Sequence, residues 1–383
     1  MRQRQQSGDG LSTHHPGLEY SRFAEHIVAL DLEIHPAEDR LMALGAYAPG
    51  RDQGLNLRPG RDQAPALKQL DAFCQGHGFV LGHNILGHDL PVLRKMAPGL
   101  KLLHLPPLDT LFLSPLTFPR NPYHRLVKDY KLIKQSVNDP LSDARLAMEL
   151  FRDQWQALRD MDESLALAYA WLLKQGLPGT GYEHLITALT GRPLPDQDSI
   201  KATWLKETTG RACQTQAKQV FATYLKNPDQ VAGLAYGLAW LRVAGGNSVL
   251  PPWVRHRFPD LPSLLDRLRS IPCRDSDCAY CRGQPDLEAS LERHFGFASF
   301  LPVKDEDPPL QQEIVSCLLG GESCLAVMPT GGGKSLCYQL PGLIKAEQRN
   351  TLSIIISPLQ SLMKDQVDGL KARGIPNVGT VNG

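Results

Sequence analysis

Three consecutive glycines followed by a lysine and a serine occur near the end of the chain. The segment Met328–Ser335 reads Met-Pro-Thr-Gly-Gly-Gly-Lys-Ser. Glycines let backbone N–H groups approach phosphate oxygens without obstruction by a Cβ atom, while Lys334 supplies positive charge and Ser335 a hydroxyl ligand for Mg²⁺. A helix beginning at Ser335 would point its positive end at the same anion. The pattern predicts a nucleotide-phosphate site, with Met328 where the strict motif has a glycine.

Segments on either side of this loop carry related motifs. Upstream, Gln311 lies in the run Leu310–Val315, and the apolar stretch Cys324–Val327 predicts a buried strand that ends at the loop. Downstream, residues 357–367 read Ser-Pro-Leu-Gln-Ser-Leu-Met-Lys-Asp-Gln-Val. Together with residues 329–341, these motifs resemble the start of the first, RecA-like P-loop lobe of a RecQ-family ATP-dependent DNA helicase.

The resemblance implies ATP as cofactor and DNA as partner. It implies that Gln311 reads adenine and that residues 357–367 contact the DNA backbone. Two departures from the family pattern lie just before Gln311: Pro308-Pro309-Leu310 stands in place of Arg-Pro-Gly, and an acidic stretch at 305–307 looks inserted. The residues implied to hold ATP are Gln311, Thr330, Gly331, Gly332, Gly333, Lys334 and Ser335, with Ser335 also a ligand of Mg²⁺.

The sequence ends at Gly383, inside what would be the third strand of that lobe. No Asp-Glu-x-His segment follows, so the carboxylate that would hold Mg²⁺ and the second lobe with its arginine finger are missing. We therefore expect an incomplete helicase lobe and a chain that is a fragment of a longer enzyme.

Four carboxylates in the first part of the chain could hold two divalent ions. Asp31 and Glu33 alternate in the predicted strand 27–34, so both leave it on one face. Asp89 is expected at a helix that follows a strand near residue 79, and Asp143 near the start of a helix that runs to about residue 159. Neighbouring carboxylates repel one another unless cations lie between them. Taken singly, the strand pair also fits a solvated edge, and Asp143 also fits a helix dipole.

In this order, the four carboxylates and the Gly82-His83-Asn84 motif resemble the DEDD-type 3′–5′ exonucleases. Leu108–Leu111 matches a further strand of that family, and the resemblance covers about residues 27–154. It implies a ribonuclease-H-like α/β fold and a site in which two Mg²⁺ or Mn²⁺ ions clamp the scissile phosphate. The implied catalytic and metal-binding residues are Asp31, Glu33, Asp89 and Asp143.

The general base of such a site has no clear counterpart. The family has a His five residues, or a Tyr four residues, before the last Asp, and here those positions are Asn138 and Asp139. The alternatives are His124 or His88 as base, activation of water by the metals alone, or a domain that only binds. The segment 122–131, around His124, interleaves cations and aromatic rings, which suits single-stranded DNA and equally suits a solvated basic face.

Three of the eight cysteines, Cys273, Cys278 and Cys281, form a C-x-x-x-x-C-x-x-C cluster. Their soft thiolates suit Zn²⁺ or an iron–sulfur cluster, and the alternative is three free thiols. For a fourth ligand, His294 and His256 are the nearest candidates. The remaining cysteines are scattered, which argues against a disulfide framework and fits a reducing compartment.

Composition sets wider bounds. The 383 residues carry 41 Lys and Arg against 40 Asp and Glu, so DNA contacts must come from local patches. No apolar run is long enough for a membrane span and no signal peptide is evident, which makes a cytoplasmic location the default. We predict a disordered N-terminus at 1–22, an exonuclease-like domain at 23–159, a helical connector at 160–268, a metal knuckle at 269–294 and the incomplete helicase lobe at 295–383.

The expected function is therefore a RecQ-like 3′–5′ DNA helicase fragment with a front domain that trims or grips a 3′ end, in DNA repair or recombination. One alternative is a nuclease-inactive clamp attached to the helicase. Another is an exonuclease whose P-loop segment is a remnant. The sequence does not decide between DNA and RNA at the nuclease site, and it leaves the oligomeric state open.

Overall fold

The computed structural model describes residues 18–35, 40–121, 139–243, 250–269, 273, 275, 278–282, 286–302, 309–319, 323–329 and 331–381. The chain divides into two compact units, one formed by Met1–Trp204 with Tyr224–Tyr236 and the other by Leu205–Thr223 with Gly237–Gly383. Among the described residues, none of the helices combines the length and apolar character needed to cross a membrane.

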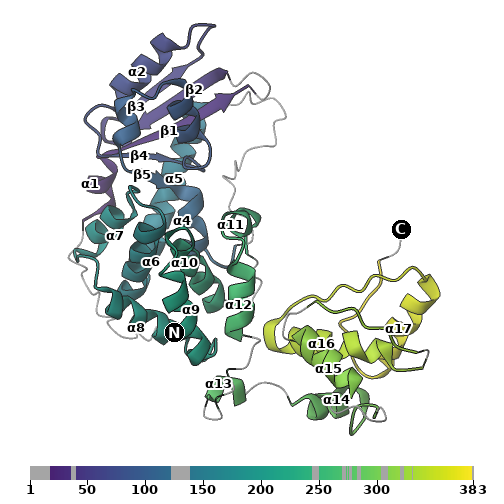
Figure 1. The fold of residues 1–383 in the computed structure, drawn as a ribbon. Helices are drawn as coiled ribbons and strands as arrows, with labels where there is room; N and C mark the ends of the chain where they lie inside the picture. Colours follow the sequence, from purple (N-terminus) through teal and green to yellow (C-terminus); the bar gives the residue numbers. More distant parts are fainter. Residues whose placement is uncertain are drawn as a thin grey trace, which may run out of the picture. The chain divides into compact units, whose positions relative to one another are not determined.

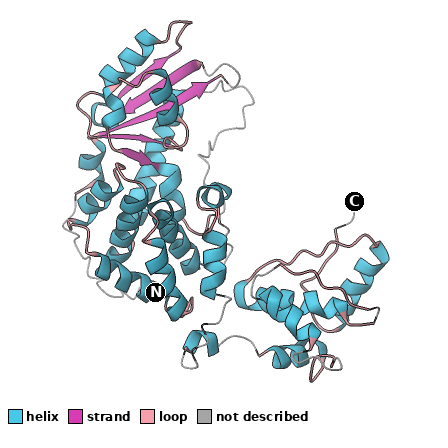
Figure 2. Ribbon diagram, in the orientation of Figure 1, coloured by secondary structure: helices cyan, strands magenta, loops and turns pink. Residues whose placement is uncertain are grey.

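A five-stranded mixed sheet lies in the first unit (Figure 1 and Figure 2). The strands are β1 (Ile27–Ile34), β2 (Leu41–Ala48), β3 (Gln53–Leu57), β4 (Phe79–Gly82) and β5 (Pro107–Asp109), in the order β3-β2-β1-β4-β5. The central strand, β1, pairs antiparallel with β2 and parallel with β4. The outer pairs are β2 with β3, which is antiparallel, and β4 with β5, which is parallel.

The start of β1 is buried on both faces. Ile27, Val28, Ala29 and Leu30 are all buried, as expected for a central strand with layers packed above and below it. The predicted strand at 27–34 is thus confirmed, and its second half carries Asp31 and Glu33.

Five helices accompany the sheet. They are α1 (Tyr20–Ala24), α2 (Ala64–Cys74), α3 (Asp89–Met96), α4 (Thr110–Thr117) and α5 (Pro140–Arg159), with short 3₁₀ turns η1 (Pro49–Arg51) and η2 (Lys101–His104). The long helix α5 packs against β1 and β2. Its buried residues repeat at helical spacing, and the apolar ones include Ala144, Ala147, Met148, Phe151, Trp155 and Leu158. This confirms the helix predicted to run to about residue 159 and the α/β class.

The middle of the chain is helical, as predicted for residues 160–268. Its helices are α6 (Glu163–Gly176), α7 (Tyr182–Thr190), α8 (Gln197–Thr208), α9 (Gln214–Tyr224), α10 (Pro228–Val243), α11 (Pro252–Arg257) and α12 (Leu261–Arg269). Residues 177–181 connect α6 to α7. The division between the two units falls within this helical stretch. It does not coincide with the predicted domain boundaries, which stay predictions.

The last part of the chain contains α13 (Ala279–Arg282), α14 (Leu287–Phe295), α15 (Leu310–Leu319), α16 (Lys334–Arg349) and α17 (Gln360–Ala372). A small apolar core joins α14, α15, α16 and α17, and it includes Leu291, Phe295, Val315, Leu340, Ile344 and Leu370. The helix expected to begin at Ser335 begins one residue earlier, at Lys334.

The predicted buried strand at Cys324–Val327 is wrong. Residues 323–329 have no strand assignment, and the side chains of Leu325 and Val327 are 94% and 84% exposed. A strand needs at least one hydrogen-bonded neighbour, and the strands of a parallel sheet also have covered faces. None of the described residues pairs with this segment, so its apolar pattern alone does not make it a strand.

The N-terminal end of α5 lies directly on the backbone of β2 at Gly45. A Cβ atom at Gly45 would lie 2.1 Å from the backbone nitrogen of Leu141 and 2.2 Å from the carbonyl carbon of Pro140. Gly45 is also the register partner of Asp31 on β1. This glycine therefore lets the first turn of α5, which carries Asp143, come close to the carboxylates of β1.

We expect Gly45→Ala to destabilise the first unit. The added methyl group must push the helix away from the sheet, and overpacking of this kind costs about 1–3 kcal/mol. The matched control is Gly60→Ala, because a Cβ atom there meets nothing within 4 Å. Thermal unfolding followed by circular dichroism should show a lower midpoint for the first variant alone. Equal midpoints for both variants would contradict the close approach.

Candidate functional sites

Three of the predicted carboxylates meet at one place. Oxygen atoms of Asp31, Glu33 and Asp143 all lie within 4.8 Å of one another, and each residue is partly buried. The two-residue spacing on β1 puts Asp31 and Glu33 on one face of the sheet, and the contact at Gly45 brings Asp143 to that face. Hard carboxylate oxygens at this spacing suit Mg²⁺ or Mn²⁺.

Asp89 lies beside this cluster without belonging to it. Its Oδ1 accepts the backbone N–H of Leu32 at 2.9 Å, and Leu32 lies between Asp31 and Glu33 on β1. The pairing of β1 with β4 ends at Ala29, so beyond that point Asp89 supplies a hydrogen-bond acceptor to the edge of β1 that β4 leaves unpaired. Burial raises the pKa of Asp89, and its contact with His88 and the N–H of Leu32 oppose that shift.

The turn that leads into Asp89 is held by a buried carboxylate, Asp109. Its oxygens accept backbone N–H groups from Asn84 at 2.9 Å, Leu86 at 3.0 Å and Leu111 at 2.9 Å. Asn84 has a φ of +66°, a left-handed backbone conformation that residues other than glycine adopt rarely. Burial raises the pKa of Asp109 to about 7, against the lowering effect of these three donors.

Sequence reasoning placed Asp109 in a strand motif and gave its side chain no role. The signal that could have found it is its position, since an Asp between a strand and a helix is a preferred N-cap. Asp109 is indeed the N-cap of α4, accepting the N–H of Leu111. The same carboxylate thus caps one helix and shapes the loop before another.

Of the two histidines considered as a general base, His88 lies next to the carboxylates. Its Nδ1 is 3.8 Å from Oδ1 of Asp89, an ion-pair distance, and its side chain is 47% exposed. The pKa of His88 is raised, and the main cause is its hydrogen bond with the Asp89 carboxylate. The negative charges of Asp31 and Glu33 raise this pKa further. His124 lies outside the described residues, as does Asn138.

Asp139 occupies the position where the resembling family has a tyrosine. Its Oδ1 accepts a hydrogen bond from the Asn56 side chain at 2.7 Å, and its Oδ2 accepts one from the Ser142 hydroxyl. The bond from Ser142 lowers the pKa of Asp139 most, and Asn56 contributes in the same direction. This carboxylate therefore links β3 to the start of α5.

The glycine loop leads directly into α16, and Gly333 is the N-cap residue of that helix. Gly331 and Gly333 have φ of +83° and +72°, which favour glycine. The Nζ atom of Lys334 donates to the carbonyl oxygens of Met328 at 2.8 Å and Pro329 at 3.0 Å. The ammonium group is thus held inside the loop. Thr330 lies outside the described residues.

Gln311 is buried against this loop. Its Oε1 accepts the N–H of Leu301 at 3.0 Å, and its Nε2 donates to the carbonyl of Gly332 at 3.1 Å. A cavity of about 440 Å³ lies beside it, and its lining includes the apolar side chains Phe295, Phe297 and Leu301 and the polar side chains Ser335, Gln339 and Gln366. Glycines of the loop line the same cavity.

Ser335 connects the loop to the downstream motif. Its Oγ accepts a hydrogen bond at 2.9 Å from Nε2 of Gln366, which lies on α17, and Gln366 also accepts one from the Gln339 side chain. The segment 357–367, predicted to contact DNA backbone, therefore packs through α17 against the residue predicted as a Mg²⁺ ligand.

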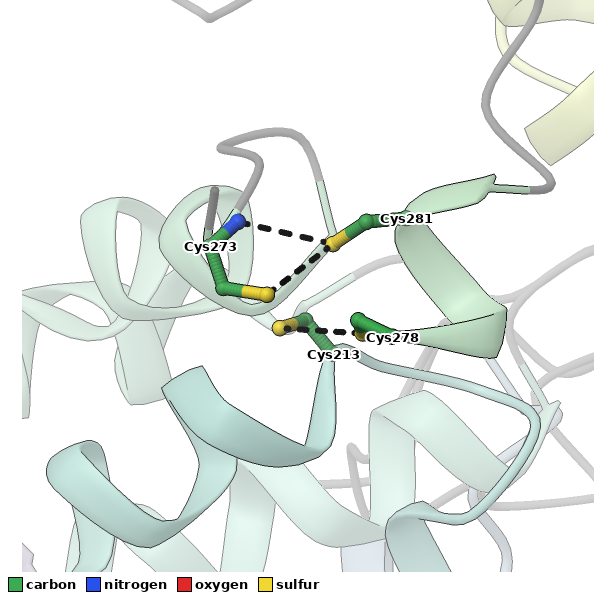
Figure 3. A group of neighbouring side chains, drawn as sticks. All are labelled: Cys213, Cys273, Cys278 and Cys281. Carbon is green, nitrogen blue, oxygen red and sulfur yellow. Dashed lines mark hydrogen bonds between the residues drawn. The ribbon is translucent and has the colours of Figure 1, made fainter. Parts of the chain in front are cut away.

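The three clustered cysteines meet a fourth that sequence reasoning missed. Sγ atoms of Cys213, Cys273, Cys278 and Cys281 all lie within 4.8 Å of one another (Figure 3). The suggested fourth ligands, His294 and His256, are not part of this group. Nε2 of His294 instead lies 3.4 Å from a carboxylate oxygen of Glu347. A single cysteine far upstream has no local spacing signal, so only the fold reveals Cys213.

The last part of the chain is similar to known helicases. Residues 308–382 match the sequence model of the DEAD/DEAH box helicases. The probable ATP-dependent DNA helicase RecS of Bacillus subtilis is 45% identical over 96 residues, 25% of this chain and 17% of that protein. The ATP-dependent DNA helicase RecQ of Synechocystis is 42% identical over 90 residues, 24% of this chain and 16% of that protein.

A human relative, ATP-dependent DNA helicase Q4, is 53% identical over 62 residues, 16% of this chain and 5% of that protein. The chain thus spans less than a fifth of the length of these relatives. No solved structure matches it. These similarities concern the last part of the chain, which matches DEAD/DEAH box helicases and is similar to RecQ-type DNA helicases.

We expect the pH dependence of stability to report on Asp109. Since its pKa in the folded state is raised to about 7, the folded protein binds the extra proton between about pH 4 and 7, and stability from this group falls as the pH rises through that window. Asp109→Asn removes this contribution to the free energy of unfolding. The contribution is about 1.4 kcal/mol for each unit by which the pKa of Asp109 in the folded protein exceeds its pKa in the unfolded chain. The stability difference between wild type and variant, measured by urea unfolding at several pH values, should therefore change with pH.

The control is Asp153→Asn, an exposed residue on α5. The pH dependence of its stability difference from wild type gives the background for the Asp109 variant. A difference for Asp109→Asn that varies with pH no more than this background would show that this carboxyl group does not titrate as its burial requires.

Proposed function

We propose that this chain is part of a RecQ-like ATP-dependent 3′–5′ DNA helicase whose front domain is a two-metal 3′–5′ exonuclease of ribonuclease-H-like fold. The observation that carries the nuclease half is the convergence of Asp31, Glu33 and Asp143 within 4.8 Å. The match of residues 308–382 to DEAD/DEAH box helicases carries the other half. A role in DNA repair or recombination belongs to the same proposal and rests on the resemblance.

The sheet supports the ribonuclease-H-like assignment. Its order, β3-β2-β1-β4-β5, joins an antiparallel meander to two parallel strands, and α5 packs against the central strands. In this arrangement the metal ligands leave the central strand and the helix that crosses it. That is the placement implied by the resemblance to DEDD exonucleases.

The carboxylates fit divalent metal ions. The oxygens of Asp31, Glu33 and Asp143 lie close enough to share ions, and three like charges so close favour a bound cation. We assign Asp89 as a fourth ligand, oriented by its hydrogen bond from the Leu32 amide. When bound, Mg²⁺ or Mn²⁺ supplies Lewis acidity to the scissile phosphate and its leaving 3′ oxygen.

The protein residues around the carboxylates would orient the DNA end and move protons. His88, beside Asp89 and half-exposed, is the described histidine best placed to accept a proton from water near the carboxylates. Asp139 is engaged by Asn56 and Ser142, and its lowered pKa makes it a weak base. The proposed base is therefore His88.

A nuclease-inactive clamp is the second candidate. The specific observation in its favour is that Asp139, at the family's tyrosine position, serves to fasten α5 to β3. In a clamp the carboxylates and any bound ions would hold a 3′ end without cleaving it. Cleavage assays separate the two candidates.

For the helicase half, we propose that ATP binds across the cavity beside Gln311. The phosphates would lie on the glycine loop, where Lys334 would exchange its two carbonyl partners for phosphate oxygens, and Ser335 would ligate Mg²⁺. Phe295, Phe297 and Leu301 would flank the base. Gln311 already contacts both the loop and Leu301, so it is placed to sense the base and the phosphates together.

We expect Asp143→Asn and Asp31→Ala each to abolish release of nucleotides from 3′-labelled single-stranded DNA with Mg²⁺ or Mn²⁺. Loss of a metal ligand removes several kcal/mol of transition-state stabilisation, which corresponds to at least about 100-fold in rate. The matched control is Asp153→Asn, which changes an exposed carboxylate of the same helix and should leave the rate unchanged. DNA binding without cleavage by the wild-type chain in either metal would establish the clamp instead.

We expect Lys334→Ala to weaken binding of a fluorescent ATP analogue. A lysine contact to phosphate contributes about 1.5–3 kcal/mol, so affinity should fall at least about tenfold. Lys371→Ala, an exposed lysine on α17, is the control and should bind as wild type. Equal affinities for all three proteins would remove the glycine loop from the nucleotide site.

A further inference from the structure

We propose that Cys213, Cys273, Cys278 and Cys281 bind one zinc ion as a tetrathiolate structural site. The four residues come from two separate stretches of the chain, one at the start of α9 and the other between α12 and the end of α13. The site is independent of the nuclease and helicase functions proposed above.

The sulfur positions match a single tetrahedral ion. Sγ of Cys213 lies 3.8 Å from Sγ of Cys278, and Sγ of Cys281 lies 3.7 Å from Sγ of Cys273. With a Zn–S bond of about 2.3 Å, the edge of a tetrahedron of sulfurs is about 3.8 Å. Figure 3 shows these pairs with all four side chains converging on a common point.

The same spacing argues against an iron–sulfur cluster. In a four-iron cluster each thiolate binds a different iron at the outside of an inorganic core, so the core separates the sulfurs. Four Sγ atoms that all lie within 4.8 Å leave no room for such a core.

The spacing also argues against two disulfides. A disulfide places its sulfurs about 2.05 Å apart and needs only two cysteines at a time. Here all four cysteines are free, and each sulfur is close to every other one. One shared ion explains why four thiols from distant segments meet at one point.

Backbone groups around the cysteines support the thiolate form that zinc requires. The N–H of Gln216 points at Sγ of Cys213 at 3.5 Å, and the N–H of Cys273 points at Sγ of Cys281 at 3.5 Å. Cys213 also precedes the first turn of α9, where the helix dipole favours negative charge. The other three cysteines are partly exposed, so metal has access to the site.

The zinc would add to hydrogen bonds that already connect α9 to α12. The N–H of Cys213 donates to the carbonyl of Leu268 at 2.9 Å, and the Arg267 side chain donates to Gln216 and Gln219, each at 2.8 Å. These bonds join α9 to α12. Coordination by Cys273, Cys278 and Cys281 would then fasten the short helix α13, and the chain that continues to α14, to the same helices.

The first test measures metal in the chain purified without added metal or chelator. Elemental analysis should find one zinc per chain and no stoichiometric iron or acid-labile sulfide. Replacement by Co²⁺ should give the intense absorption bands of a tetrahedral tetrathiolate site. Iron with sulfide, or no metal together with disulfides in non-reducing peptide maps, would each overturn the assignment.

The second test asks whether Cys213 is a ligand. Cys213→Ser should lower zinc retention against a chelator at least about tenfold, whereas Cys324→Ser, an exposed cysteine outside the group, should retain zinc as wild type. Cys213→His keeps a ligand in place, so its cobalt derivative should bind with a shifted spectrum. Full retention in Cys213→Ser would overturn the role of Cys213. If that variant does not fold, the shifted or unshifted spectrum of the histidine variant decides the question.

Discussion

The close approach of a helix to a strand determines the chemistry of the first unit. The start of α5 lies on the backbone of β2 at Gly45, where a side chain of any other type would collide with Pro140 and Leu141. Gly45 pairs with Asp31, so the same contact that packs the helix also brings Asp143 to the carboxylates of β1. Packing energy from the apolar face of α5 thereby offsets the repulsion among three negative groups, and a cation would relieve that repulsion.

Two other buried aspartates, Asp109 and Asp89, accept hydrogen bonds from the backbone. Asp109 is fully buried and uses its oxygens on three backbone N–H groups, whereas Asp89 uses one oxygen on the edge of β1 beyond its pairing with β4. Asp109 accepts donors from the turn before α3 and from the first turn of α4, and Asp89 accepts one donor of β1 that β4 leaves unpaired. Asp109 therefore maintains the backbone near the cluster of Asp31, Glu33 and Asp143, whereas the N–H of Leu32 holds in place the carboxylate of Asp89, the proposed fourth ligand.

The cysteine group and the glycine loop depend on different kinds of information. The loop residues are consecutive, so their left-handed glycines, lysine and helix start follow from local sequence, and the similarity to RecQ-type helicases rests on such local motifs. The cysteine group joins α9 to the segment after α12, and no spacing rule connects Cys213 to the other three. His294 and His256, although closer in sequence to the three cysteines, lie outside this group, and Nε2 of His294 lies 3.4 Å from a carboxylate oxygen of Glu347.

Sequence alone determined the local elements and residue types: the strand at 27–34, the long helix that carries Asp143, the helical middle of the chain, the glycine loop before α16 and the three-cysteine cluster. These features follow from periodicity, capping and short spacings, which act within a few residues. Tertiary structure decided which of these residues come into contact with one another. It added Cys213, left Asp89 outside the three-carboxylate cluster, gave Asp109 its supporting role, and left Cys324–Val327 exposed because a strand exists only where another strand accepts its hydrogen bonds.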